Sequence, residues 1–214
     1  MQDVIALLGG TFNPPHKGHI ESALDVMTHL GLSAMGLMPC KLPPHKSAGG
    51  VSEHHRVAMV KLVCQAHPSL YPELVELSLP SPSYTVKTLQ HLRQQNTDRP
   101  ILFVIGQDSL DTLDSWYEWE QITDYCHLVV MRRDSQTGPH TAALARWIEE
   151  RRCHDPAVLR TTRSGALYMV PTRLHPASST AVRGQVAADN ATDASQWLEP
   201  DIINYIKQHQ LYVK

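Results

Sequence analysis

The sequence predicts an α/β fold, a three-layer structure in which helices cover both faces of a doubly wound, mostly parallel sheet. Short apolar runs that end in glycine or polar residues alternate along the chain with segments of helical periodicity. The runs are continuously apolar, as strands buried on both faces are, and their alternation with helices favours parallel βαβ units. With 214 residues, 42% of them hydrophobic, the chain suits a single domain, residues 1–214, with a substantial core.

The first three elements are expected to be a strand, a helix and a second strand. Residues 4–10, VIALLGG, are a short apolar run that two glycines end, which predicts a buried strand. From Gly18 onward apolar residues recur at helical spacing until Gly31, a typical helix stop. Residues 32–39, LSAMGLMP, are a second strand candidate, and the Pro- and Gly-rich stretch after them predicts a loop with a basic tip.

The middle of the chain repeats this alternation. Ser52 opens a helical pattern that runs to residue 66, and residues 73–79, ELVELSL, are expected to form a strand. A further helix is expected within residues 81–95. It precedes ILFVIG at 101–106, which is the clearest central strand of the sequence because it is both short and wholly apolar.

The last third contains two more strand candidates, residues 125–131 and 166–170. Between them lies a region with weak strand signal, whose helical pattern at 141–152, TAALARWIEERR, is expected to be a surface elaboration. From about residue 178 the sequence predicts a C-terminal helical portion of the same domain.

Composition excludes several classes of protein. A formal net charge of −2 gives no overall basic excess, so neither nucleic acid nor an anionic membrane surface is an expected partner. No apolar run is long enough to span a bilayer, and the first residues lack the basic start of a signal peptide, so we expect a cytoplasmic protein. The four cysteines are widely spread without a C-x-x-C pair, which predicts reduced thiols rather than disulfides or structural zinc.

Ligands of open parallel sheets bind beyond the carboxyl ends of the strands. The loops that follow Leu8, Pro39, Ile105 and Val170 are therefore the expected positions of a site. The first of these loops carries GGTFNPPHKGHI, residues 9–20, the most distinctive stretch of the sequence.

This stretch allows three interpretations. Its glycines permit close approach of the backbone to a ligand, and its two histidines, His16 and His19, stand beside a predicted helix N-terminus, which together suit a phosphate group. The histidines could instead only cap or pack a turn. A zinc site would need a third ligand and a carboxylate base, and the stretch supplies neither. The Walker pattern and G-x-G-x-x-G are also absent, which disfavours P-loop enzymes and dinucleotide dehydrogenases.

GGTFNPPHKGH resembles the G-G-T-F-D/N-P-x-H-x-G-H signature of the nucleotidyltransferase superfamily, which is related to the class I aminoacyl-tRNA synthetases. The superfamily's second motif, I-S-x-T-x-x-R, is matched near the C-terminus by SSTAVRG, without the usual Ile. Within the superfamily, LPPHKS, SYTVKTL, FVIGQDSLDTLDSWYEWEQI and LEPDIINYIKQHQLY resemble segments of the bacterial nicotinate mononucleotide adenylyltransferases. The resemblance covers nearly the whole chain except about residues 134–165, and it implies a Rossmann-like nucleotidyltransferase fold.

The resemblance implies the reaction of ATP with nicotinate mononucleotide to give deamido-NAD and pyrophosphate, without a covalent enzyme intermediate. It implies that His16, His19 and Arg183 act on the reacting phosphates, and that Mg²⁺ is held largely by ATP and water. Residues that match the family's ATP site are Gly9, Gly10, Thr11, Phe12, His16, His19, Gly106, Asp108, Ser179, Thr180 and Arg183. The small-molecule substrates are the expected partners, for a monomer or a small homo-oligomer.

The same resemblance implies a mononucleotide site. It includes Trp116, which would stack on the pyridine ring, and backbone N–H groups that would receive the nicotinate carboxylate and so separate the acid from its amide. Residues that match this site are Asn13, His45, Lys46, Tyr84, Thr85, Val86, Trp116 and Tyr117. In this chain Lys87 stands where many family members carry Asp.

Each assignment has a structural alternative. Trp116 could pack in the core, and Asp108 could cap a helix. The PPHK loop could be a solvated tip, and Arg56 could form a surface pair with Glu53. The family's R-P-G turn is missing after Met131, which leaves a site role for Arg132 and Arg133 open against ordinary exposed charges.

Three other functions remain as rivals. Another nucleotidyltransferase of the same fold, for example one that adenylylates phosphopantetheine, would lack a reason for the PPHK, SYT and WYEW segments. A non-catalytic nucleotide-binding sensor would not need both histidines of the first motif. A small metal-binding interaction protein would need ligand spacing that the sequence does not contain.

Overall fold

The computed structural model describes residues 4–41, 51–132, 141–172, 177–187 and 194–213. Within these ranges seven strands form one sheet, and every strand pair in it is parallel. In sheet order the strands are β3 (Leu70–Pro72), β2 (Met35–Pro39), β1 (Ile5–Gly10), β4 (Ile101–Gly106), β5 (His127–Arg132), β7 (Leu167–Pro171) and β6 (Arg152–Cys153). The predicted α/β class with a doubly wound parallel sheet is thereby confirmed.

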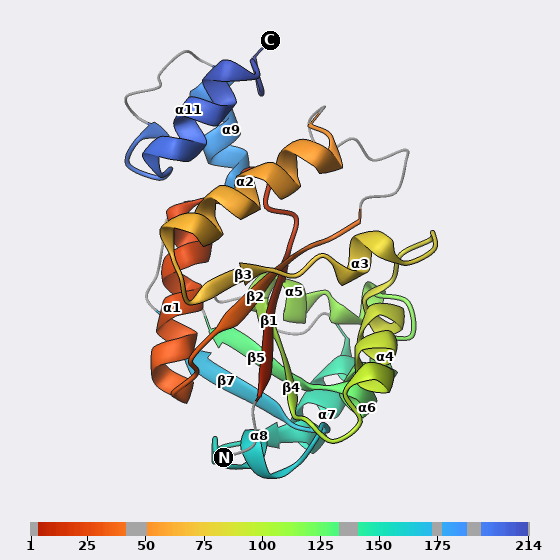
Figure 1. Cartoon of the computed structure of the whole chain (residues 1–214). Helices are drawn as coiled ribbons and strands as arrows, with labels where there is room; N and C mark the ends of the chain where they lie inside the picture. The colour runs from red at the N-terminus through yellow and green to blue at the C-terminus, as the bar shows by residue number, and fades with distance from the viewer. Residues whose placement is uncertain (1–3, 42–50, 133–140, 173–176, 188–193, 214) are drawn as a thin grey trace.

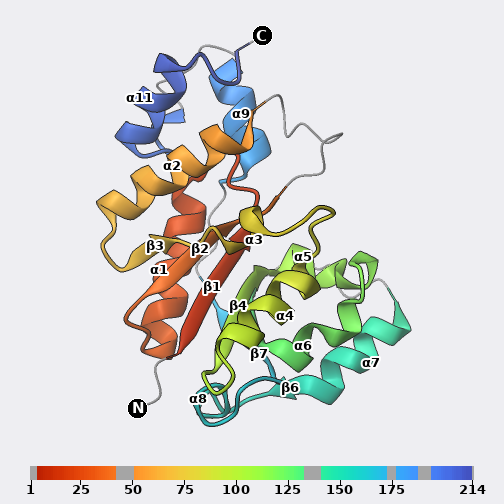
Figure 2. The ribbon, with the colours of Figure 1, turned by 45° about the vertical axis from the view of Figure 1, so that its right-hand side comes forward.

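Helices cover both faces of this sheet (Figures 1 and 2). On one side lie α1 (Lys17–Leu30) and α2 (Glu53–Ala66), with α8 (Val158–Thr161) at the lower end. On the other side lie α3 (Val75–Ser78), α4 (Thr85–Gln95), α5 (Gln107–Asp111), α6 (Ile122–Tyr125) and α7 (Ala142–Arg151), with the 3₁₀ turns η1 (Leu113–Ser115) and η2 (Trp119–Gln121). The C-terminal helices α9 (Ser179–Ala187) and α11 (Pro200–Gln208) lie beside α2.

The alternation of side chains along the central strands divides the core into two halves. Ala6 and Leu8 of β1 face the layer of α1 and α2, whereas Leu7 between them faces the layer of α4 and α6. All three side chains are at most 2% exposed. A strand that buries successive residues on both faces must be apolar throughout, which explains the continuous runs seen in the sequence.

Two helix ends follow the local rules that the sequence suggested. Ser52 caps α2, and its Oγ accepts the N–H of His55 at 3.4 Å. Gly31 ends α1 in the left-handed region with φ of 60°, where it donates its N–H to the carbonyl groups of Met27 and Thr28. The end of α1 and the start of α2 therefore lie where the sequence predicted them.

The strand predicted at residues 73–79 is wrong. The third strand lies earlier, at Leu70–Pro72, and the chain then turns into α3. The carboxylate of Glu73 accepts the N–H of Val75 at 2.9 Å, which favours the turn. The apolar residues of ELVELSL are only partly buried, and the buried side chain in this segment is Glu76. The apolar residues of this segment therefore do not line a buried face of the sheet, as those of a strand would.

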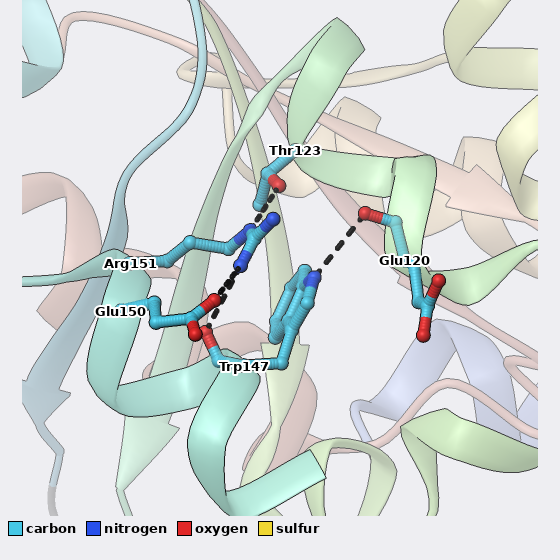
Figure 3. A network of polar contacts seen from close by, with 5 residues as sticks. All are labelled: Glu120, Thr123, Trp147, Glu150 and Arg151. Carbon is cyan, nitrogen blue, oxygen red and sulfur yellow. Dashed lines mark hydrogen bonds and ion pairs between the residues drawn. The ribbon is translucent and has the colours of Figure 1, made fainter. Parts of the chain in front are cut away.

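The prediction that residues 141–152 are a surface elaboration is also wrong. Leu144, Trp147 and Ile148 of α7 are buried in the second half of the core. Figure 3 shows how polar contacts fix the helix: the indole N–H of Trp147 donates to the carbonyl of Glu120 at 3.2 Å, and Arg151 Nε donates to Thr123 at 3.1 Å. The chain then enters β6, so α7 belongs to the helical layer.

Candidate active site

The candidate site lies at the carboxyl end of β1, where the strand order reverses between β1 and β4. Gly9 and Gly10 end this strand and pass closely over aromatic rings. A Cβ at Gly9 would lie 2.7 Å from the ring of Phe103, and one at Gly10 would lie 3.1 Å from that of Phe12. The two glycines therefore have a packing role beside the ligand role that the motif implies.

Phe12 turns the chain away from the sheet. Its φ is 49°, in the left-handed region that non-glycine residues seldom adopt, and its side chain is fully buried. Phe12 is one of the predicted ATP-binding residues, and because its side chain is buried it could contact a ligand only through its backbone. Thr11 before it is exposed, whereas Asn13 after it is 2% exposed.

The structure brings the two sequence motifs together, although Asn13 and Arg183 are 170 positions apart in the sequence. Arg183 of α9 donates from Nη1 to the carbonyl of Asn13 at 2.8 Å, and Ser179 Oγ donates to the carbonyl of Pro14 at 3.3 Å. Arg183 also donates from Nη2 to Thr180 Oγ1 at 3.1 Å. The second motif therefore lies against the turn of the first, as the resemblance implies for one common site.

His16 and His19 stand side by side at the start of α1. His16 is the N-cap residue and is 3% exposed, whereas His19 in the first turn is partly exposed. Their ring centroids are 3.7 Å apart, and the backbone N–H of His16 donates to His19 Nδ1 at 3.2 Å. Since Nδ1 accepts this bond, the proton of a neutral His19 lies on Nε2. His19 thus offers an N–H donor at the positive end of a helix.

The SYT and WY segments also meet. Tyr84 is the N-cap residue of α4, and its ring stacks on that of Tyr117 with centroids 4.3 Å apart. The Lys87 ammonium lies 5.3 Å from the Tyr84 ring centroid. Trp116 is partly buried and packs against the second half of the core. Part of its side chain is therefore in the core and part is accessible. The amide groups of Thr85 and Val86 belong to the first turn of α4, where N–H groups have no intrahelical acceptor.

Two other predicted residues lie at neighbouring strand ends. Gly106 ends β4 and caps α5, and Asp108 is an exposed residue in the first turn of that short helix. Asp108 is therefore not the N-cap, which was its structural alternative. Arg132 ends β5 with an exposed side chain. Three further candidates, His45, Lys46 and Arg133, lie outside the described residues.

Two residues beside the turn were missed by sequence reasoning. Arg56 does not form a surface pair with Glu53: its side chain is fully buried, and Nη1 donates to the carbonyl of Thr11 at 2.9 Å. Tyr212, near the C-terminus, donates its hydroxyl to Asn13 Oδ1 at 2.6 Å. Burial raises the pKa of the Tyr212 phenol, against the lowering effect of Arg183 and Arg56, so it stays a hydrogen-bond donor.

The charges around the turn are cationic. Arg56 of α2 and Arg183 of α9 donate to its carbonyl groups, whereas Lys17 at the start of α1 donates from Nζ to the carbonyl of Ser195 at 3.1 Å. Among the described residues no group of three or more His, Cys, Asp or Glu side chains is placed to hold a metal ion. The arrangement can therefore bind anionic groups through side chains, backbone N–H groups and a helix N-terminus.

The chain is similar in sequence to known proteins over almost all of its length. Residues 7–185 match the cytidylyltransferase-like family. A protein of Shewanella frigidimarina named "Probable nicotinate-nucleotide adenylyltransferase" is 38% identical over 213 residues, which cover 97% of this chain and 99% of that protein. A protein of Idiomarina loihiensis with the same name is 37% identical, with coverage of 97% and 99%.

Solved structures share the fold. The nicotinic acid mononucleotide adenylyltransferase of Plasmodium falciparum complexed with NaAD superposes with a TM-score of 0.74 at 19% identity, covering 98% of this chain and 97% of that one. The same enzyme complexed with APC superposes with a TM-score of 0.72. At this level of identity the superpositions establish the common fold.

Proposed function

The chain belongs to the nicotinate-nucleotide adenylyltransferases of the cytidylyltransferase-like family, and from this membership we propose which residues carry each part of the reaction. The protein catalyses ATP-dependent adenylyl transfer to nicotinate mononucleotide, a step of NAD biosynthesis. The products are deamido-NAD, also called nicotinate adenine dinucleotide, and pyrophosphate. The substrates are therefore both anionic small molecules.

One observation supports the assignment of residues above all others. The turn at Asn13 and Pro14, which belongs to the first motif, is held by Arg183 and Ser179 of the second motif. The two histidines follow this turn directly at the N-terminus of α1. Polar groups from the two ends of the chain thus lie at one turn, which supports the assignment of a triphosphate site there.

We assign the phosphate chemistry to His16, His19 and Arg183. A phosphate oxygen of the mononucleotide attacks the α-phosphorus of ATP, the bond from that phosphorus to the bridging oxygen breaks, and pyrophosphate leaves with the bond electrons. A phosphate nucleophile needs no general base, so positioning and stabilisation of charge supply the rate. The Nε2–H of His19 suits a non-bridging oxygen of the reacting phosphate, and Arg183 suits the oxygens of the leaving group.

We assign recognition of the nicotinate carboxylate to the start of α4. Its first N–H groups, at Thr85 and Val86, point out of the helix end where a carboxylate is favoured. Tyr84 and Tyr117 stack on each other beside this end, and Trp116 precedes Tyr117 in the same segment. An amide in place of the carboxylate would leave N–H donors facing an NH₂ group, which disfavours the amide substrate.

Mg²⁺ enters this scheme with ATP. The ion would be held by the ATP phosphates and water rather than by a cage of side chains, and it would neutralise charge that develops on the leaving group. The described part of the chain offers no three-ligand cluster for it. We place the reaction in the cytoplasm: all four cysteines are free thiols, which suits a reducing compartment. No helix among the described residues is both long and apolar enough to cross a membrane.

The assignment of substrates is tested by pyrophosphate release. Purified protein with Mg-ATP should release pyrophosphate only when nicotinate mononucleotide is added, and the nicotinamide mononucleotide should be used much less efficiently. Both mononucleotides should be compared by kcat/KM in one assay, because that ratio measures the discrimination directly. Release with phosphopantetheine but not with either mononucleotide would show that the second substrate has been assigned wrongly.

A further inference from the structure

Arg56 is a cation in an unusual position. It belongs to α2, and it is 0% exposed. Nη1 donates to the carbonyl of Thr11 at 2.9 Å. Among the described residues Nε and Nη2 have no hydrogen-bond acceptor. Burial of such a charge is costly, so a purely structural position would more often hold an apolar side chain.

The carbonyl that Arg56 holds belongs to the turn at the candidate site. Phe12 follows Thr11 with φ of 49°, and such a conformation persists only where neighbouring contacts stabilise it. Arg56 of α2 holds the turn at the carbonyl of Thr11, whereas Arg183 of α9 holds it at the carbonyl of Asn13. Loss of the bond from Arg56 would let the turn relax, and the N–H groups and histidines around it would move with it.

Glu76 is the buried anion nearest in character to Arg56. It lies in α3, is 5% exposed and accepts the backbone N–H of Lys41 at 2.9 Å and the hydroxyl of Ser83 at 3.0 Å, both through Oε1. Ser83 directly precedes Tyr84, the N-cap residue of α4. Glu76 therefore fixes the chain at the point where it enters the helix assigned to the nicotinate carboxylate.

The two charges hold neighbouring stretches of backbone: the amide of Cys40 donates to the carbonyl of Gly10 at 2.9 Å, beside Thr11, and the amide of the next residue, Lys41, donates to Glu76. Burial raises the pKa of Glu76, while the N–H of Lys41, the hydroxyl of Ser83 and the charge of Arg56 lower it. Lys41 adds a further link, because its ammonium donates to the carbonyl groups of Leu77 and Leu79 at 3.4 and 2.7 Å after α3. Arg56, which bonds to the turn after β1, and Glu76, which bonds to the residue before α4, are thus buried behind the two segments assigned to the substrates.

We propose that Arg56 and Glu76 are a pair of buried positioning residues, in which Arg56 fixes the ATP-binding turn through Thr11 and Glu76 fixes the entrance of α4 through Ser83. The inference rests on the proposed function, because it assigns ATP to the first loop and the mononucleotide to α4. Neither residue touches a substrate. Their effect on the reaction is to hold two loops in one relative position.

The test for Arg56 compares two substitutions with a matched control. Arg56→Met removes the charge and the donor, and Arg56→Lys keeps the charge with one donor. Arg93 is the control, because it also donates to backbone carbonyl groups, those of Asn96, Arg99, Tyr125 and Arg163, but at the C-terminal end of α4 away from the site. Steady-state kinetics, calorimetric binding of Mg-ATP and urea unfolding should be measured for each.

We expect Arg56→Met to weaken Mg-ATP binding and to lower kcat/KM by about tenfold or more, since a hydrogen bond from a charged group is lost. Arg56→Lys should recover part of this loss, and Arg93→Met should lower stability without a change in KM for either substrate. If Arg56→Met does not fold, the Lys variant still decides. Wild-type KM and Mg-ATP affinity in Arg56→Lys or Arg56→Met would overturn the inference, because the residue would then serve folding alone.

The test for Glu76 uses the isosteric change Glu76→Gln, with Glu73→Gln in the same segment as the control. We expect Glu76→Gln to raise KM for nicotinate mononucleotide by about threefold to tenfold with a smaller change for ATP, because the amide replaces a buried charge that accepts two hydrogen bonds. Glu73 caps only the turn into α3, so its variant should keep both KM values. Equal changes for both substrates in Glu76→Gln would contradict the division of roles.

The pair is tested by combining the two changes. In the variant Arg56→Met/Glu76→Gln, the loss of kcat/KM should be smaller than the product of the two single losses, because each single change leaves the other charge buried alone. Fully multiplicative losses would show that the residues act independently. Failure of the wild-type protein to turn over nicotinate mononucleotide would instead contradict the proposed function, and the Mg-ATP binding arm would still test Arg56.

Discussion

The ring of His19, a catalytic candidate, is held in one orientation by its neighbour His16. Its Nδ1 accepts the N–H of His16 at 3.2 Å, and this bond fixes both the tautomer and the direction of the ring. A ring held in this way presents Nε2–H without a loss of side-chain freedom when the phosphate arrives. The role that we propose for His19 in phosphoryl transfer requires such a preorganised donor.

Replacing His19 by Ala should therefore lower kcat by about 100-fold or more, since one preorganised donor to a reacting phosphate is lost. The free energy of unfolding should change by about 1 kcal/mol or less, because His19 is a partly exposed polar residue in the first turn of α1. His54→Ala is the control, as His54 is exposed on α2. A large loss of stability with unchanged kcat would show that His19 only packs the turn.

Trp116 is assigned to the site of only one of the two substrates, nicotinate mononucleotide. If its indole stacks on the pyridine ring, Trp116→Ala should raise KM for nicotinate mononucleotide by about tenfold and leave KM for ATP nearly unchanged, since stacking on one aromatic ring is worth about 1–3 kcal/mol. Trp119→Ala is a suitable comparison, because its ring lies against Trp147 with centroids 5.4 Å apart. Equal changes in both KM values would identify Trp116 as a packing residue.

At this scale the two motifs were readable from the sequence, whereas the residues behind them were not. His16, His19 and Arg183 stand in recognisable patterns, and the structure brings their segments together. Arg56 was interpreted as a surface charge because arginine is seldom fully buried. Its position was nevertheless informative: it precedes Met59, Val60 and Val63 at helical spacing and so lies on the buried stripe of α2.

Among whole elements, prediction succeeded where a strand is buried on both faces and failed where it is not. ILFVIG at 101–106 was predicted correctly because both sheet neighbours and both helical layers demand apolar residues there. Residues 73–79 were predicted incorrectly because a polar residue, Glu76, supplies the buried contact in that segment. Short apolar runs do not distinguish a strand from a short helix without tertiary contacts.

A buried histidine at the start of β5 bonds to the segment that precedes β7. His127 is fully buried in β5, with Nε2 2.9 Å from the carbonyl of Thr162 and Nδ1 accepting the N–H of Ala166 at 3.1 Å. Burial lowers its pKa from the ordinary value of 6.5, as does Arg93, against the raising effect of the Thr162 carbonyl. Protonation of Nδ1 would break the bond to Ala166 and place a charge between strands.

Stability should therefore depend on pH through His127. In the unfolded chain its pKa is near 6.5, so as the pH falls below that value the unfolded state takes up a proton that the folded state resists, and the free energy of unfolding decreases. His127→Gln should flatten this decrease between about pH 7 and 5. Chemical denaturation across that range measures it, with the exposed His154→Gln as control. Identical slopes in wild type and His127→Gln would refute the assignment.

For the molecule as a whole, the C-terminal portion closes onto the first loop of the chain. The amide of Lys17 donates to the carbonyl of Trp197 at 2.8 Å, and the hydroxyl of Tyr212 reaches Asn13. A second set of contacts joins α11 to α2, with His55 Nδ1 2.9 Å from the Tyr205 hydroxyl and His67 2.6 Å from Glu199. Figure 1 shows α9 and α11 together at this end of the molecule. The residues to which we assign ATP binding thus lie where the two ends of the chain meet.

Two tyrosines of the C-terminal portion make different contacts: the hydroxyl of Tyr212 bonds to Asn13 in the turn, and that of Tyr205 bonds to His55 in α2. Removing each hydroxyl therefore tests whether the C-terminal portion acts through the turn or only through its attachment to α2. Tyr212→Phe leaves the buried Asn13 Oδ1 without this donor, and we expect a loss of about 1–3 kcal/mol that appears largely as a raised KM for ATP, because Asn13 forms the turn that Arg183 holds. Tyr205→Phe should lower stability by about 1 kcal/mol and leave both KM values unchanged, since its partner His55 contacts Ser52, His54 and the C-terminal portion. Steady-state kinetics and urea unfolding of the two variants decide between these roles. If both variants changed KM for ATP equally, the C-terminal portion would act through its overall attachment and not through the contact of Tyr212 with the turn.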